Sequence, residues 1–117
     1  PDSWYGGSAA AMGQENYDEW RRAIHNPDTV RAMLEDYRAG VTIDRQHEEA
    51  DRQAGRAVTV PLLLLWSLRD DLVDLYGDPL RVWERWAIDA RGYGIDSGHH
   101  MAEEVPDELS SALLGFL

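Results

Sequence analysis

The apolar residues in the first half of the chain recur at intervals of three and four positions, the spacing of a helix with one buried face. This spacing predicts a helix over residues 14–24 and a more polar helix over residues 42–54. Between them, Asn26 suits an N-cap, and Pro27 suits the first position of a helix that we expect to end at Gly40. This middle helix carries an apolar stripe that is predicted to be buried: Val30, Met33, Leu34 and Tyr37.

The pattern changes at Val60. The continuous apolar run Val60–Trp66 predicts a parallel strand buried on both faces, and residues 92–96 predict a second strand. Helices are expected to open at Asp78 and at Pro106, and the first of these has the apolar stripe Leu80, Trp83, Trp86 and Ala87. Strands that alternate with helices form parallel sheets, and two such strands do not make a stable core alone. The second half therefore predicts one edge of a larger, doubly wound α/β sheet.

The length, the net charge and the absence of cysteine exclude several classes of protein. The chain has 117 residues, enough for one domain, and a formal net charge of −11. Binding to nucleic acid or to an anionic membrane surface relies on Lys and Arg, so this acidic balance argues against both partners. No apolar run reaches the roughly 18 residues of a membrane span. The absence of Cys excludes disulfides, zinc–thiolate sites and a Cys nucleophile.

One motif stands near the C-terminus, where residues 98–106 read GHHMAEEVP. This segment resembles the G-H-x-x-x-x-E-x-P motif that closes many α/β-hydrolases, in which the His is the catalytic base. Three segments precede this motif along the chain. Together with it they resemble, in the same order, the C-terminal portion of the haloacetate dehalogenases, a family close to the epoxide hydrolases. They are EDYRAG (residues 35–40), VPLLLLW (60–66) and DPLRVWERWA (78–87). The chain resembles that family over residues 16–117.

The resemblance implies an α/β-hydrolase fold in two parts. Residues 1–55 would belong to the helical cap over the active site, and residues 56–117 would form the C-terminal part of the core. The small, glycine-rich residues 1–13 predict a loop or linker. The chain contains no G-x-S-x-G elbow and no matching Asp elbow, so the nucleophile and oxyanion hole would precede Pro1. We therefore expect no hydrolytic turnover from this chain alone.

His99 is the predicted catalytic base. A His that follows a strand end, beside Gly98, can project into the cleft at the carboxyl edge of a parallel sheet. The usual pKa of His, about 6.5, suits proton transfer near neutral pH. Without the motif, a surface His in a turn would be the better interpretation. His100 is taken as a neighbour that need not act.

Asp70 is the candidate acid that orients His99. It follows Trp66 by four positions, as in the W-G-x-x-D pattern of many α/β-hydrolases, with Ser67 in place of the usual Gly. Haloacetate dehalogenases often place this acid after the preceding strand, which would lie outside this chain. A solvated loop carboxylate is the alternative interpretation, and Asp71 is a poorer candidate.

The resemblance also implies two donors to a departing halide, the phenol of Tyr37 and the indole of Trp4. A small anion that leaves in a dry pocket must be met by positioned donors. From its spacing alone, Tyr37 would instead end the apolar stripe of its helix. Matching both Trp4 and Tyr37 to the two halide donors of the family requires a gap in the alignment.

The resemblance implies hydrolysis of a carbon–halogen bond in a haloacetate-like acid through an Asp-ester intermediate, with His99 as the base. Alternatives of the same fold are an epoxide hydrolase and a serine esterase, and an alternative of another class is a non-catalytic acidic module. We expect a small halogenated carboxylic acid as the substrate, with no cofactor and no metal. We further expect a cytoplasmic location, and a homodimer is one arrangement compatible with this interpretation.

Overall fold

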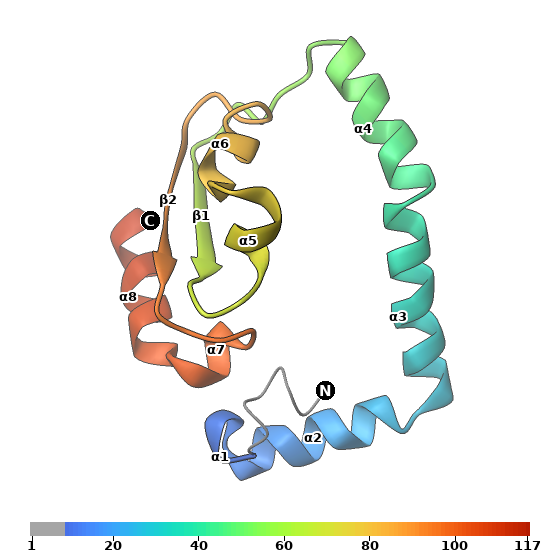
Figure 1. The fold of residues 1–117 in the computed structure, drawn as a ribbon, viewed down its shortest axis with the longest axis vertical. Coiled ribbons are helices and arrows are strands. Elements are labelled where there is room, and N and C mark those ends of the chain that lie inside the picture. The colour runs from blue at the N-terminus through green and yellow to red at the C-terminus, as the bar shows by residue number, and fades with distance from the viewer. Residues whose placement is uncertain (1–8) are drawn as a thin grey trace. The chain divides into compact units, whose positions relative to one another are not determined.

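The computed structural model describes residues 9–117, which form two compact units (Figure 1). One unit comprises residues 15–57, and the other combines residues 9–14 with residues 58–117. The division after residue 57 lies near the predicted boundary at residue 55, and the assignment of the two parts to cap and core stays a prediction. Trp4 lies outside the described residues.

Three helices form the unit of residues 15–57: α2 (Gln14–Ile24), α3 (Pro27–Gly40) and α4 (Ile43–Gln53). Asn26 caps α3 as predicted, because its Oδ1 accepts a hydrogen bond from the N–H of Asp28 at 3.0 Å. The helix ends at Gly40 as predicted, but without the left-handed glycine that commonly stops a helix. Gly55, which follows α4, does adopt such a conformation, with a φ of 64°.

The apolar stripe of α3 is not buried, contrary to the prediction. Met33, Leu34 and Tyr37 are 49%, 59% and 71% exposed. No described residue of this helix is buried, and the same holds for α2 and α4. Helical spacing predicts which residues share a face, but the burial of that face depends on the element that packs against it.

Two parallel strands, β1 (Leu62–Ser67) and β2 (Ala90–Ile95), form the sheet of the other unit. The register runs from Leu62 opposite Ala90 to Ser67 opposite Ile95. Both strands and their parallel pairing were predicted. The residues of β1 are half-buried, however, and not buried on both faces as predicted. In the described part of the chain β1 has a neighbouring strand on one side only, which leaves its other edge uncovered by sheet.

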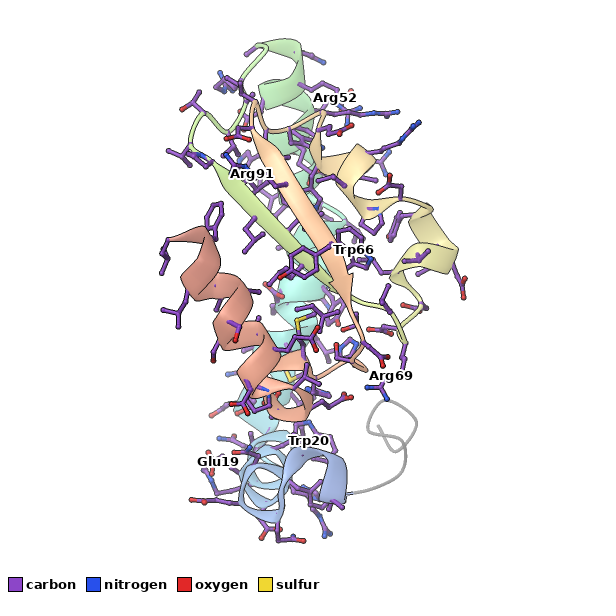
Figure 2. All side chains as sticks on the ribbon, turned by 90° about the vertical axis from the view of Figure 1, so that its left-hand side faces the viewer. Glu19, Trp20, Arg52, Trp66, Arg69 and Arg91 are labelled. Atoms are coloured by element: carbon purple, nitrogen blue, oxygen red, sulfur yellow. The ribbon has the colours of Figure 1, made fainter. Side chains whose placement is uncertain are left out.

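Helices cover both sides of the strands. α5 (Leu72–Tyr76) and α6 (Pro79–Trp83) connect β1 to β2, whereas α7 (Met101–Glu104) and α8 (Pro106–Phe116) follow β2. α8 lies on one side of the strands, and α5 and α6 lie on the other (Figures 1 and 2). This strand–helix–strand order confirms the predicted α/β class.

Short elements account for most differences from the predicted pattern. α1 (Ala9–Met12) lies in a segment predicted to be loop, and it packs against α7, for which no element was predicted. α5 was also missed. The helix that opens at Asp78 ends at Trp83, so Ala87 does not extend its stripe and instead pairs with Val58 in an isolated bridge. A helix of four or five residues is too short to show a periodic stripe.

The deepest part of the sheet unit lies at the carboxyl ends of the strands. Ile95 ends β2 and Ser97 begins the following turn, and both have an exposed fraction of 0%. The turn that carries His99 therefore starts from a firmly packed position. None of the helices within residues 9–117 is long and apolar enough to cross a membrane.

Candidate active site

The loops that follow β1 and β2 are hydrogen-bonded to each other. The N–H of Leu68 donates to the carbonyl of Ile95 at 2.9 Å, and the N–H of Arg69 donates to the carbonyl of Ser97 at 3.1 Å. These bonds extend the parallel ladder past the strand ends and bring the two loops side by side. Figure 2 shows Arg69 in this region. The carboxyl edge of a parallel sheet is where open α/β folds place their ligand sites.

Asp70 and His99 meet at this edge. Asp70 Oδ2 lies 2.6 Å from His99 Nδ1, although 29 positions separate the two residues in the sequence. The Asp70 side chain is 26% exposed and the His99 side chain is 44% exposed. The pair is thus formed at a partly open surface, where His99 can reach a substrate or a water molecule.

Asp70 is held in its charged form. Its Oδ1 accepts the backbone N–H of Asp71 at 2.9 Å, while its Oδ2 faces His99. The hydrogen bond from Asp71, followed by that from His99, lowers the pKa of Asp70 below its usual range. An ionised carboxylate only accepts hydrogen bonds, so His99 donates from Nδ1 and keeps Nε2 as its basic nitrogen.

Two serines tie the loops together beneath this pair. Ser67 Oγ donates to the carbonyl of Gly98 at 2.5 Å, and Ser97 Oγ donates to Ser67 Oγ at 3.0 Å. Ser67 stands where the W-G-x-x-D pattern has Gly, so its hydroxyl adds a bond that glycine could not make. This bond could not be predicted from the sequence pattern, because it joins residues 31 positions apart.

Glu104 is a site residue that the sequence analysis did not single out. Its Oε2 accepts the backbone N–H of Gly98 at 2.7 Å, and its Oε1 accepts the backbone N–H of His100 at 3.2 Å. The signal that could have revealed it is the Glu of the G-H-x-x-x-x-E-x-P motif, which falls at this position.

Arg69 links the two loops by charge. Its Nη2 donates to the carbonyl of Asp96 at 2.8 Å, and its Nε lies 3.1 Å from Asp96 Oδ1. The same Nη2 lies 3.9 Å from Glu104 Oε2. The Arg69 side chain is 57% exposed, so these ion pairs are screened by solvent and contribute little stability individually.

His100 differs from His99 in its surroundings. Burial lowers the pKa of His100, and the adjacent His99 adds to this effect. The two rings lie edge to face, with centroids 5.1 Å apart and an interplanar angle of 70°. A neutral His100 places no second positive charge beside His99.

Tyr37 and Asp71 are the further predicted residues within the described part of the chain. Tyr37 belongs to α3, in the unit of residues 15–57, and is 71% exposed. Asp71 lies in the site and donates its backbone N–H to Asp70 Oδ1. Within residues 9–117, no group of three or more metal-binding side chains is placed to hold a metal ion. What the site offers chemically is a carboxylate-oriented imidazole that can act as a general base.

The fold, together with the two loops that follow β1 and β2, defines the class of protein. The chain has the fold of the C-terminal part of an α/β-hydrolase. A protein from Pseudomonas aeruginosa assigned as an epoxide hydrolase superposes with a TM-score of 0.86 at 34% identity, over 99% of this chain and 38% of that protein. A protein from Nostoc sp PCC 7120 assigned as an α/β hydrolase has a TM-score of 0.82 at 32% identity, over 93% of this chain and 36% of that protein.

A similar protein at the level of sequence is the fluoroacetate dehalogenase of a Burkholderia species. It is 28% identical across 100% of this chain, and the match covers 40% of its own length. No family model matches the chain. The chain thus spans between 36% and 40% of the length of these three relatives.

Proposed function

We propose that this chain provides the general base of a hydrolase, with His99 as the base and Asp70 as the acid that orients it. The observation that carries the proposal is the 2.6 Å contact between Asp70 Oδ2 and His99 Nδ1 at the carboxyl ends of parallel strands. In a triad-like arrangement the acid holds the imidazole in the tautomer whose Nε2 can take a proton. The nucleophile is supplied by a part of the protein outside these 117 residues.

The proposed reaction is the hydrolytic dehalogenation of a haloacetate-like acid. A carboxylate oxygen of an Asp nucleophile attacks the halogen-bearing carbon, and the halide leaves with the electrons of the carbon–halogen bond. His99 Nε2 then takes a proton from water, whose oxygen attacks the carbonyl carbon of the enzyme ester. The acyl–oxygen bond breaks, the imidazolium returns its proton to the departing alkoxide, and a 2-hydroxy acid is released. The similarity to the Burkholderia fluoroacetate dehalogenase supports this substrate class.

Tyr37 and Trp4 are the proposed donors to the leaving halide. Within the described residues Tyr37 is 71% exposed. A phenol O–H and an indole N–H can both donate to an anion, and a desolvated pocket strengthens such bonds.

Epoxide hydrolysis is the second candidate, and the similarity to the Pseudomonas aeruginosa protein favours it. It would use the same ester chemistry and the same base, with Tyr37 donating a proton to the epoxide oxygen. A serine esterase would use His99 toward a Ser nucleophile. These three reactions differ in the nucleophile and the substrate, whereas the role of His99 is the same in each.

The test begins with the coding DNA upstream of the Pro1 codon, which identifies the nucleophile. The protein encoded by the whole reading frame is then assayed for halide release from fluoroacetate and chloroacetate, for epoxide ring opening and for ester hydrolysis. An Asp nucleophile with halide release supports the dehalogenase. An Asp nucleophile with epoxide turnover only, or a Ser nucleophile with ester turnover, replaces it by the corresponding alternative. A start codon directly before Pro1 would favour the non-catalytic module.

The role of His99 is tested separately, by His99→Ala in the active protein. We expect turnover to fall by about 10²–10⁴-fold, because general-base catalysis of ester hydrolysis is lost. Mass spectrometry should then detect the trapped ester on the Asp nucleophile. His47→Ala, at an exposed position of α4, should keep its activity. Wild-type turnover in His99→Ala would overturn the assignment.

A further inference from the structure

The carboxylate of Glu104 holds the backbone on both sides of His99. Its Oε2 accepts the N–H of Gly98 at 2.7 Å and its Oε1 accepts the N–H of His100 at 3.2 Å. The side chain of Glu104 is only 14% exposed, so these bonds are largely shielded from solvent. Hydrogen bonds from N–H groups to a charged acceptor are stronger than those between neutral groups.

The backbone of the same turn completes the arrangement. The carbonyl of His100 accepts the N–H of Glu104 at 2.9 Å, which begins α7. His100 and Glu104 thus exchange two hydrogen bonds, one through the backbone and one through the side chain. This resembles a capping box with its Glu one position further along the helix. The turn at His99 is therefore anchored to the first residues of α7.

The backbone position of His99 decides where its imidazole lies. The side chain is partly exposed, with an exposed fraction of 44%. Its Nδ1 nevertheless lies 2.6 Å from Asp70 Oδ2, and a hydrogen bond of this length requires a defined backbone position. The two amides that Glu104 binds are those of the residues directly before and after His99.

We propose that Glu104 is a positioning residue that holds His99 in register with Asp70. It acts through the backbone amides of Gly98 and His100 and does not touch the reacting atoms. This inference rests on the proposed role of His99 as the base, since positioning matters for catalysis only if His99 acts. Without Glu104, the turn relaxes, His99 leaves Asp70, and the Nδ1–H tautomer is no longer imposed on the imidazole.

The experiment measures the tautomer of His99 by nitrogen-15 NMR of the imidazole, in the protein encoded by the whole reading frame and at a pH where the ring is neutral. The wild-type chain should show a protonated Nδ1 on His99, and the amide protons of Gly98 and His100 should resonate as strongly hydrogen-bonded protons. Glu104→Ala should move both amide protons toward the values of exposed amides and reduce the Nδ1–H population. Thermal unfolding of each protein shows that the comparison is made between folded chains.

Two further variants separate positioning from general loss of stability. Glu104→Gln keeps one acceptor oxygen in a side chain of the same shape, so it should restore part of the Nδ1–H population and one of the two amide shifts. Glu103→Ala removes the same charge from the same helix turn while leaving both bonds of Glu104 intact, and it should resemble the wild-type chain. An unchanged His99 tautomer in Glu104→Ala or, where that variant does not fold, in Glu104→Gln would overturn the proposal.

This readout needs neither substrate nor nucleophile. Failure of the hydrolase assays would therefore leave the effect of Glu104 on the His99 tautomer measurable. A changed tautomer without turnover would support the positioning and count against the proposed function alone.

Discussion

Gly98 and Glu104 leave no space between them. A Cβ atom at position 98 would lie 2.6 Å from Glu104 Oε1 and 2.9 Å from Oε2, and the three atoms nearest to it all belong to this carboxyl group. Gly98 does not have a positive φ, so a side chain at this position would conflict with the present place of the Glu104 carboxylate and not with the backbone conformation. The Gly and the Glu of the G-H-x-x-x-x-E-x-P motif therefore depend on each other.

We predict that Gly98→Ala lowers the free energy of unfolding by about 1–3 kcal/mol, because the added methyl group displaces the carboxylate from its two amides. In a Glu104→Ala background the same change should cost less than about 0.5 kcal/mol. Urea unfolding of the wild-type chain, both single variants and the double variant gives the coupling energy. Additive costs would contradict the steric relationship between the two residues.

Ser67→Ala should lower the free energy of unfolding by roughly 1–3 kcal/mol. The substitution removes the acceptor of the fully buried Ser97 hydroxyl and the donor to the Gly98 carbonyl. A buried polar group that loses its partner costs more than an exposed one. Urea unfolding measures the change, with Ser110→Ala on the exposed surface of α8 as the control. Equal stabilities of the two variants would show that the serine pair does not hold the loops.

The stability of the chain should depend on Asp70 in acid. Its folded-state pKa is lowered, whereas an Asp in the unfolded chain has a pKa of about 3.9. Between these values the unfolded chain binds more protons, so the free energy of unfolding rises with pH. The contribution of Asp70 is therefore present above about pH 4 and is lost as the pH falls through the folded-state value.

Asp70→Asn tests this pH dependence. The stability difference between the wild-type chain and the variant should shrink as the pH falls from about 5 to about 2, because both side chains are then uncharged. Urea unfolding at a series of pH values measures the difference. Asp74→Asn, at an exposed position of α5, controls for the loss of one negative charge. A difference that stays constant down to the lowest pH would count against a stabilising Asp70 carboxylate.

Gly92→Ala should lower the free energy of unfolding by about 2–4 kcal/mol. In the register of the sheet Gly92 lies opposite Leu64, and a Cβ atom would lie 2.1 Å from the Leu64 carbonyl oxygen. That oxygen belongs to the backbone of β1 and cannot move without disturbing the strand. Gly115→Ala in α8 is the matched change, since no atom lies within 4 Å of its added Cβ. It should be neutral or stabilise α8 by up to about 1 kcal/mol, because Ala favours helix over Gly.

Thermal unfolding of Gly92→Ala and Gly115→Ala measures how much stability each variant loses relative to the wild-type chain. A large loss at position 92 and none at position 115 supports the register that pairs Leu64 with Gly92. Equal effects at the two positions would indicate a different pairing of the strands.

The longer elements were predictable because each carries its own local signal. The N-cap Asn26 and the following Pro27 marked the start of α3, and the run Val60–Trp66 marked β1 to within two residues at its start. The alternation of strands with helices predicted their parallel pairing. Four- and five-residue helices such as α5 and α7 could not be predicted in this way, because one turn of helix shows no periodicity.

The sequence by itself determined the class of the chain and named His99 as the base and Asp70 as a candidate acid to orient it, since a motif and a spacing are local properties. Only the tertiary structure decided that they meet, because 29 positions separate them and the parallel register of β1 and β2 brings their loops together. The exposure of the α3 stripe and the bonds of Ser67 and Glu104 were likewise decided in three dimensions. Burial and hydrogen bonding depend on what lies opposite a residue, and periodicity along the chain carries no such information.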